Sequence, residues 1–264
     1  METTIRLTAS LGIFLIMICW EYFSPRRDFS LSRQQRWPIN LGLALFNIAI
    51  MRLTIGGLAY FYAVIAQENN WGLLNNLNTP DWLAIIITLL FLDFAIYGQH
   101  IASHKWSFLW RLHQVHHTDL AFDATTAVRF HPLEIIISMF YKVCCIILIG
   151  ANPIAVIAFE IILNGAATFN HSNINIPTGI DKKLRWLIIT PDMHRIHHST
   201  IPKETDSNYG FSISCWDRLC RTYTQSPEQP QEIMNIGLES FKDPSELSFK
   251  KLLILPLKAL KARQ

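Results

Sequence analysis

The sequence predicts an all-α, polytopic membrane protein with four to five transmembrane or hairpin helices and a cytoplasmic, histidine-rich helical cap. Half of its 264 residues are hydrophobic and only 16% are charged, which is typical of a chain whose surface is partly solvated by lipid. Several apolar stretches approach the ~20 residues that a helix needs to cross hydrocarbon. All ten histidines fall between His100 and His198, so function is expected in that part of the chain.

Composition argues against two other classes of protein. A formal net charge of +3 is too small to indicate a nucleic-acid partner. The five cysteines include an adjacent pair inside an apolar run, Cys144 and Cys145, and they form no framework of spaced pairs. They therefore predict reduced thiols and no disulfide scaffold.

Five apolar stretches are candidates for membrane helices. They are residues 7–20, 39–66, 82–98, 133–150 and 154–169. The first does not follow a markedly basic start, lacks the small-residue cleavage site of a signal peptide and is followed by Arg26 and Arg27, so it is predicted to be a retained anchor. Only Ala151, Asn152 and Pro153 separate the last two. Residues 133–169 are therefore predicted to form a tight helical hairpin, and the sequence leaves open whether there are four spans or five.

Lysine and arginine in short loops predict which side of the membrane is cytoplasmic. The loop after the first stretch holds Arg26, Arg27, Arg33 and Arg36, whereas residues 67–81 hold no lysine or arginine. The first loop is therefore predicted to be cytoplasmic. Counting the spans onward from that loop places every histidine on or near the cytoplasmic face.

The C-terminal stretch from Phe249 to Gln264 is basic and amphipathic, and Pro256 interrupts it. A basic amphipathic helix is expected to lie on the membrane surface. The proline limits the length of such a helix, so a mobile basic tail is an equally good interpretation.

Eight of the ten histidines fall in three clusters whose members are mostly three or four residues apart. The clusters are His100 and His104, then His113, His116 and His117, and finally His194, His197 and His198. Because residues three and four apart share one face of a helix, each cluster can direct its imidazoles toward one point. The other two histidines, His131 and His171, stand at the ends of the predicted hairpin.

These clusters predict a binuclear metal site. A single histidine is usually a surface or hydrogen-bonded side chain, but neutral imidazole is the commonest metal ligand in proteins. Eight to ten nitrogens exceed what one ion can use, so two neighbouring ions are expected. The chain contains no H-E-x-x-H and no Glu-x-x-His, which disfavours hydrolases and soluble di-iron bundles. A histidine-rich membrane protein that binds or transports metal without oxygenase activity is the alternative.

The clusters, placed behind hydrophobic spans, resemble the integral-membrane fatty acid hydroxylase/sterol desaturase superfamily. The resemblance covers roughly residues 80–225 and includes further matches outside the clusters. These are Asp93-Phe94-x-x-Tyr97, Phe130-His131-Pro132, Phe169-Asn170-His171, Thr190 to His198, Asn208-Tyr209-Gly210 and Trp216-Asp217-Arg218-Leu219. The resemblance implies a membrane-bound di-iron oxidoreductase that uses O2 and two electrons to hydroxylate or desaturate a C–H bond of a lipid. Cys220-Arg221-Thr222-Tyr223 departs from the usual ending of the last motif, which puts the local turn in doubt.

Ligand roles follow from the resemblance position by position. The implied metal ligands are His100, His104, His113, His116, His117, His131, His171, His194, His197 and His198. Nitrogen ligands separate iron from zinc only weakly, so zinc in place of the two iron ions stays an alternative. Asp93, Asp192 and Asp217 are expected to accept the second N–H of a ligand imidazole. A helix cap at Asp192 and a salt bridge at Asp217 are the alternatives.

The electrons for the reaction are expected to come from another protein. No glycine-rich dinucleotide fingerprint and no Fe–S cysteine pattern occurs, so a separate ferredoxin-like or cytochrome-like protein is expected to supply the electrons.

Three charged residues lie within the apolar stretches. Glu134 and Lys142 are expected to extend toward an interface, and Glu160 is expected to face protein.

The chain divides into three expected parts. Residues 1–81 are expected to form N-terminal membrane anchor spans and loops, and residues 82–225 the hydroxylase-like catalytic domain. Residues 226–264 are expected to form the C-terminal tail.

Overall fold

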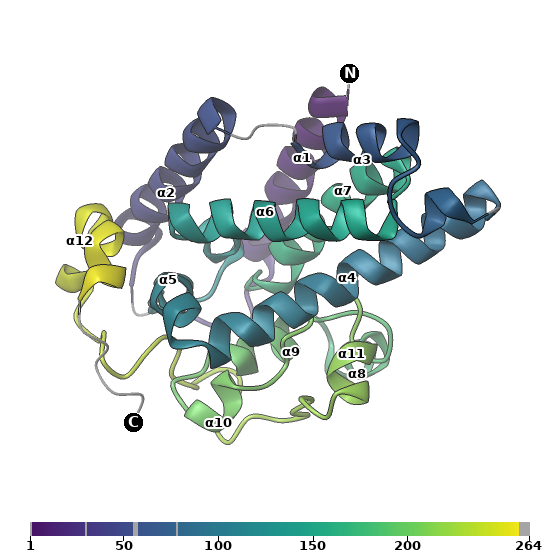
Figure 1. Cartoon of the computed structure of the whole chain (residues 1–264). Helices are drawn as coiled ribbons and strands as arrows, with labels where there is room; N and C mark the ends of the chain where they lie inside the picture. Colours follow the sequence, from purple (N-terminus) through teal and green to yellow (C-terminus); the bar gives the residue numbers. More distant parts are fainter. Residues whose placement is uncertain (1, 30, 55–57, 78, 259–264) are drawn as a thin grey trace.

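The computed structural model describes residues 2–29, 31–54, 58–77 and 79–258 (Figure 1). The α-helices are α1 Glu2–Phe23, α2 Arg33–Thr54, α3 Leu58–Glu68, α4 Asp81–Lys105, α5 Ser107–His117, α6 Pro132–Ile149, α7 Pro153–Asn170, α8 Thr178–Leu184, α9 Pro191–His197, α10 Pro202–Thr205, α11 Cys215–Leu219 and α12 Phe249–Ile254. The 3-10 helices are η1 Leu74–Asn76, η2 Ala124–Val128, η3 Pro244–Leu247 and η4 Leu255–Leu257. Apart from three isolated β-bridges, the described residues form no strand, which confirms the all-α class.

Five helical segments of the described chain are long and apolar enough to cross a membrane. They are Thr3–Phe23, the stretch Arg33–Glu68, of which the structure describes α2 and α3, Asp81–Lys105, Pro132–Ile149 and Pro153–Asn170. Large apolar side chains cover their outer surfaces: Leu11, Leu45 and Leu148 are 54%, 67% and 69% exposed. Such side chains are solvated by lipid at no cost, so the polytopic membrane class is confirmed.

Helices α6 and α7 form the expected tight hairpin. Gly150 ends α6 in the left-handed conformation, with φ at 69°. A Cβ at this position would lie 2.8 Å from the carbonyl oxygen of Trp71, so glycine serves both the turn and a close approach. The Asn152 side chain then accepts hydrogen bonds from the first backbone N–H groups of α7, which starts at Pro153.

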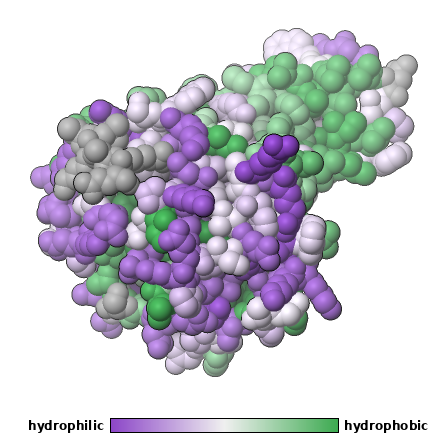
Figure 2. Space-filling view, turned by 90° about the horizontal axis from the view of Figure 1, so that it is seen from below, coloured by the Kyte–Doolittle hydropathy of each residue, from purple (hydrophilic) through white to green (hydrophobic). Residues whose placement is uncertain are grey.

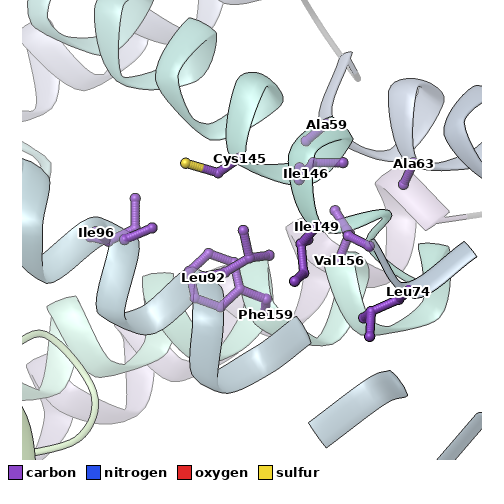
Figure 3. Close-up of a cluster of buried hydrophobic side chains, with 12 residues drawn as sticks. Ala59, Ala63, Leu74, Leu92, Ile96, Cys145, Ile146, Ile149, Val156 and Phe159 are labelled. Atoms are coloured by element: carbon purple, nitrogen blue, oxygen red, sulfur yellow. The ribbon is translucent and has the colours of Figure 1, made fainter. Parts of the chain in front are cut away.

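A buried apolar cluster joins α3, α4, α6 and α7 (Figure 3). Leu92 of α4, Ile146 of α6 and Phe159 of α7 are fully buried in it. On the side of α3, the contacts are made by the small residues Ala59 and Ala63. Lipid offers no hydrophobic drive for helices to associate, so small residues stabilise this contact by allowing close van der Waals packing.

Two buried charges at membrane depth pair with each other. The Lys142 ammonium donates to Glu160 at 2.6 Å, and Arg6 of α1 also contacts Glu160. The expectation that Glu160 faces protein is confirmed. The expectation that Lys142 extends toward an interface is wrong, because a carboxylate on the neighbouring helix offers a partner inside the bundle.

The cap lies on one side of the bundle. Helix α4 runs unbroken from the bundle into the cap, and α8 to α11 lie beneath it in Figure 1. Figure 2 views the molecule from that side, where hydrophilic residues dominate the face and a hydrophobic part projects beyond its edge. Glu21 ties the end of α1 to the cap by accepting the backbone N–H groups of Ala124 and Asn173, each at 2.7 Å.

The described part of the C-terminal stretch packs against the protein. Leu252 and Leu255 are buried in a cluster with Leu43 of α2 and Val115 of α5. The mobile-tail interpretation is therefore wrong for α12 and η4, because their apolar side chains have a partner surface. The end of the stretch, residues 259–264, lies outside the described residues.

Candidate metal centre

Nine of the ten histidines form two adjoining groups. In each group, one possible ligand atom from each residue lies within 4.8 Å of those of the others. The five-histidine group is His100, His104, His113, His117 and His197, and the four-histidine group is His116, His171, His194 and His198. Every one of these side chains is buried.

The helices explain how sequence neighbours serve different groups. Helix α4 continues past residue 98 to Lys105, so His100 and His104 share one face. Consecutive residues of a helix are turned by about 100°, so two adjacent histidines point toward different positions. In α5, His116 belongs to the four-histidine group and the adjacent His117 to the five-histidine group.

The same division occurs at α9. Thr190 caps this helix by accepting the N–H of Met193, and Pro191 occupies its first turn. His197 ends the helix within the five-histidine group, and His198 follows it within the four-histidine group. The His117 and His198 rings stack across the boundary between the groups, with centroids 4.4 Å apart. The two groups are thus close enough for a binuclear centre.

Backbone carbonyls fix the ring tautomers. The Nδ1 atoms of His100, His171 and His197 lie 2.7 Å from the carbonyl oxygens of Tyr209, Ala167 and Ser207, respectively. Because a carbonyl only accepts, each Nδ1 donates its proton, and in the neutral ring Nε2 keeps a lone pair. The Nε2 atom of His100 is buried without a hydrogen-bond partner in the described chain. This is the state of a metal ligand.

Close ring nitrogens in the four-histidine group give a second test of whether these residues suit a metal ion. The Nε2 atom of His171 lies 3.0 Å from Nε2 of His116 and 3.2 Å from Nε2 of His194. The Nδ1 atoms of His171 and His116 both face carbonyl oxygens, so their Nε2 lone pairs point at each other. Lone pairs repel at this distance, but two nitrogens that bind one ion at ~2.0–2.1 Å stand about 3 Å apart. The residues therefore fit a metal ion.

Burial keeps these imidazoles neutral. It lowers the pKa of His116, His117, His194 and His198 well below the ordinary value, and neighbouring imidazoles lower it further. Burial likewise lowers the pKa of His171 to about 4. Neutral imidazole is the form that binds metal, so the site is prepared for cations without first losing protons.

Two carboxylates that the sequence did not single out as ligand partners contact the five-histidine group. The Glu134 Oε1 atom lies 2.6 Å from Nδ1 of His113, and the Asp206 Oδ1 atom lies 3.5 Å from Nδ1 of His104. The expectation that Glu134 extends toward an interface is therefore wrong. Its place in the first turn of α6, three residues after His131, is the sequence signal that could have indicated this contact.

The three expected aspartates do not contact histidine rings directly. Asp93 accepts from the indole N–H of Trp216 at 2.8 Å, and Asp192 pairs with Arg26 and Arg195. The helix-cap alternative for Asp192 is also wrong, because Thr190 caps α9. Nearby N–H donors and guanidinium groups engage these carboxylates before any imidazole can reach them.

Asp217 acts one step further from the rings. Its carboxylate accepts the backbone N–H groups of Tyr209 at 2.8 Å and Gly210 at 2.9 Å. Burial raises the pKa of Asp217 to about 6, although these donors and Thr222 oppose the shift. Since the Tyr209 carbonyl accepts from His100, Asp217 positions a ligand through the loop and not through its own contact.

His131 lies outside both groups. Its Nδ1 atom accepts the N–H of Leu133 at 3.2 Å as the N-cap of α6, and its Nε2 atom donates to the Leu253 carbonyl at 3.1 Å. Pro132 begins α6 directly after it, which leaves the His131 ring at the helix end and next to the C-terminal segment. Both nitrogens are therefore engaged away from the site, and the candidate ligand set has nine members.

A cavity of about 480 Å³ lies between α4, α5 and α6. Most of its lining is apolar, including Ala102, Leu109, Leu112 and Ile137. Glu134, the partner of His113, forms part of its wall. This volume lies within the roughly 300–1,000 Å³ that is usual for small-molecule sites.

The chain is similar to several known proteins that are named as hydroxylases or monooxygenases. Ornithine lipid hydroxylase OlsE of Rhizobium tropici is 29% identical over 153 residues, which are 56% of this chain and 44% of that protein. Alkylglycerol monooxygenase of Xenopus tropicalis is 33% identical over 147 residues, which are 54% of this chain and 31% of that protein. Cholesterol 25-hydroxylase of Rattus norvegicus is 23% identical over 227 residues, which are 83% and 70% of the two chains.

The first two relatives are much longer than the matched segment, and the chain spans less than half of their length. No solved structure is detectably similar to the chain. Residues 85–222, more than half of the chain, match the sequence model of the fatty acid hydroxylase family. The chain therefore belongs to the fatty acid hydroxylase family.

Proposed function

We propose that the chain is a membrane-bound di-iron oxidoreductase that uses O2 and external electrons to hydroxylate, or desaturate, a C–H bond of a lipid. The observation that carries this proposal is the convergence of nine buried imidazoles in two adjoining groups, one of which Glu134 links to an apolar cavity. The named relatives act on ornithine lipids, alkylglycerols and cholesterol, which are all lipids. The metal-transport alternative requires ligands along a path through the bilayer, whereas nine histidines here gather in one cage.

The nine histidines would hold the two ions, five around one and four around the other. Bound iron would supply the activation of O2, which no amino-acid side chain performs. The chain itself contributes orientation and dryness. Backbone carbonyls and carboxylates accept hydrogen bonds from the Nδ1 atoms and so fix the ring orientations. Burial keeps water from the ligand nitrogens.

The cavity would receive an acyl or alkyl chain of the lipid. Its apolar wall suits a hydrocarbon, and Glu134 brings one side of it against a ligand of the five-histidine group. Gly98 also lines it, and an added Cβ at Gly98 would meet no atom within 4 Å. A larger side chain there would therefore enter open space without displacing the helix.

The proposal also includes the side of the membrane on which the cap lies and the source of the electrons. The arginine-rich loop after α1 favours a cytoplasmic position for the cap, and a cytoplasmic electron donor could then reach it. Basic segments such as Lys182-Lys183 would bind an acidic ferredoxin-like or cytochrome-like protein. We also propose that the division at residues 81/82 and 225/226 separates the anchor, the catalytic domain and the tail.

Metal analysis and lipid analysis together test the proposal. The full chain, purified anaerobically in lipid nanodiscs, is expected to carry two iron ions that give a di-iron Mössbauer spectrum. Cells that overproduce it under 18O2 are expected to accumulate a labelled hydroxylated lipid, or an unsaturated lipid without label. Cells that produce His197→Ala at the same level are the control and should lack the product. A single zinc ion with no iron, or lipids identical in the two strains, would overturn the proposal.

A variant at the cavity tests the route of the lipid. Gly98→Leu is expected to keep both metal ions but to lower product formation at limiting lipid, because the leucine occupies the space of the chain. Raising the lipid concentration should recover part of the rate. Unchanged product formation at every lipid concentration would remove this cavity from the proposal.

A further inference from the structure

Glu134 stands where the cavity and the metal centre meet. Its Oε1 atom lies 2.6 Å from Nδ1 of His113, a member of the five-histidine group. The same side chain lines the cavity between α4, α5 and α6, and only 12% of its surface is exposed. Contact with a ligand and contact with the lipid space thus coincide in one residue.

The chemistry of the two groups determines which of them donates the hydrogen bond. A carboxylate oxygen accepts, so Nδ1 of His113 donates and its Nε2 atom is the one that can bind metal. The Nε2 atom of His113 is buried and has no hydrogen-bond partner among the described residues. A short hydrogen bond to a charged acceptor draws the proton from the ring and makes the imidazole a stronger electron donor to its ion.

The strength of that effect depends on what fills the cavity. The second carboxylate oxygen, Oε2, is buried and has no hydrogen-bond partner in the described chain, so the charge of Glu134 is not neutralised on that side. Water in the cavity would screen this charge, whereas a hydrocarbon chain would exclude the water and lower the local dielectric. The pull of the carboxylate on His113 is then greater when the cavity holds lipid.

This inference rests on the proposed function. We propose that Glu134 is a positioning residue that transmits the filling of the lipid cavity through His113 to the metal held by the five-histidine group. The metal centre thereby responds to the presence of an alkyl chain before any reaction. Such coupling confines the reactive state to molecules that have their substrate in place.

The structure also supplies a matched control. Tyr141 lines the same cavity, but its hydroxyl donates to the Ala95 carbonyl at 3.1 Å and contacts no metal-ligand histidine in the structure. Tyr141→Phe changes the cavity wall without changing the contact with His113. Glu134→Gln keeps an oxygen acceptor for His113 and removes the charge.

The test uses Co²⁺ as the metal and hexadecane as the alkyl chain, with the full chain in phosphatidylcholine nanodiscs. Hexadecane is expected to shift the visible absorption bands of Co²⁺ in the wild type and in Tyr141→Phe. Glu134→Gln should bind Co²⁺ roughly 10- to 100-fold more weakly and, when saturated, show no shift. A wild-type shift in Glu134→Gln, or no shift in the wild type, overturns the inference.

A second variant decides the case in which Glu134→Gln binds no Co²⁺. Glu134→Asp keeps the charge on a shorter side chain, so it should bind Co²⁺ and shift with hexadecane by less than the wild type. Bound Co²⁺ without any shift would overturn the inference. The 18O2 lipid assay of the wild type runs in parallel: product with an unresponsive spectrum refutes the coupling alone, whereas no iron and no product refutes the proposed function.

Discussion

The two histidine groups share helices α5 and α9 but differ in the partners of the ring nitrogens that do not face the metal position. In the five-histidine group, the carboxylates of Glu134 and Asp206 approach the rings of His113 and His104. In the four-histidine group, the Nδ1 atoms of His116 and His171 face backbone carbonyl oxygens. The described charged side chains near this group do not contact its rings directly; they belong to the chain segments that carry the histidines.

This difference indicates that the two metal positions are unequal. A carboxylate behind an imidazole raises its basicity and holds its orientation more firmly than a carbonyl does. We therefore expect the ion of the five-histidine group to be held more tightly and the ion of the four-histidine group to exchange first.

The largest expected effect comes from removing one ligand from each group. His197→Ala and His116→Ala should each reduce the metal content from two ions per chain to one and reduce lipid oxidation to background. The ion left in His116→Ala should resist a chelator better than the ion left in His197→Ala. Metal analysis after dialysis against graded chelator measures this order. The reverse order would break the comparison between the groups.

The support of the four-histidine group depends on a buried ion pair. Arg36 of α2 donates to both carboxylate oxygens of Asp119, at 2.7 and 2.8 Å, and Asn40 links Asp119 to Arg129. Arg129 in turn offers its carbonyl to His116. Asp119→Asn should lower the free energy of unfolding by up to about 3–5 kcal/mol, because it removes one of the two carboxylates that pair with the buried Arg36 guanidinium and leaves only Asp123. Thermal unfolding in nanodiscs measures the loss, and the ion of the four-histidine group should be released first.

The same ion pair predicts a pH dependence. Burial raises the pKa of Asp119, but the Arg36 and Arg129 guanidinium groups outweigh burial and hold the pKa well below its ordinary value. A carboxyl with a depressed folded-state pKa stabilises the fold above its unfolded pKa of about 4 and loses that contribution as the pH falls further. The stability of the wild type should therefore drop below about pH 4. In Asp119→Asn this part of the drop should be absent, and an identical pH profile would contradict the assignment.

A smaller effect is expected at the second carboxylate. Asp206 lies 3.5 Å from the His104 ring, beyond a normal hydrogen bond, and its side chain is 29% exposed. Asp206→Asn should weaken metal binding at the five-histidine group by about tenfold, the lower end of the usual range for such partners. Lys105→Ala is the matched control, because Lys105 pairs with the other oxygen of Asp206 and its side chain is 51% exposed. Equal affinities in Asp206→Asn and the wild type would leave Glu134 as the carboxylate that distinguishes the groups.

Helical periodicity made much of the site predictable. The spacing of His100 and His104 and the repeated H-x-x-H-H indicated faces that converge, and the structure brings all eight of these residues into one cage. The five apolar stretches also correspond to the membrane helices, because their length and hydropathy are local properties of the sequence. What local patterns determine could be predicted.

Contacts between distant segments could not be predicted in this way. Asp206 meets His104 only because the loop after α10 folds back onto α4, and periodicity contains no information about that return. Asp93 resembled a ligand partner by its depth in an apolar helix, but its carboxylate accepts the indole N–H of Trp216 from the remote helix α11. His131 resembled a ligand by its motif, and its ring caps a helix instead.

The smallest expected effect separates the nine-member ligand set from one of ten. His131→Ala removes the acceptor for the Leu133 N–H and the donor to Leu253, so it should cost about 1 kcal/mol of stability, the usual value of an N-cap. Metal content and chelator resistance should equal those of the wild type. His131→Asn retains a capping oxygen and should recover most of the stability. If His131→Ala lost an ion, His131 would belong to the cage, and the division into groups of five and four would have to be redrawn.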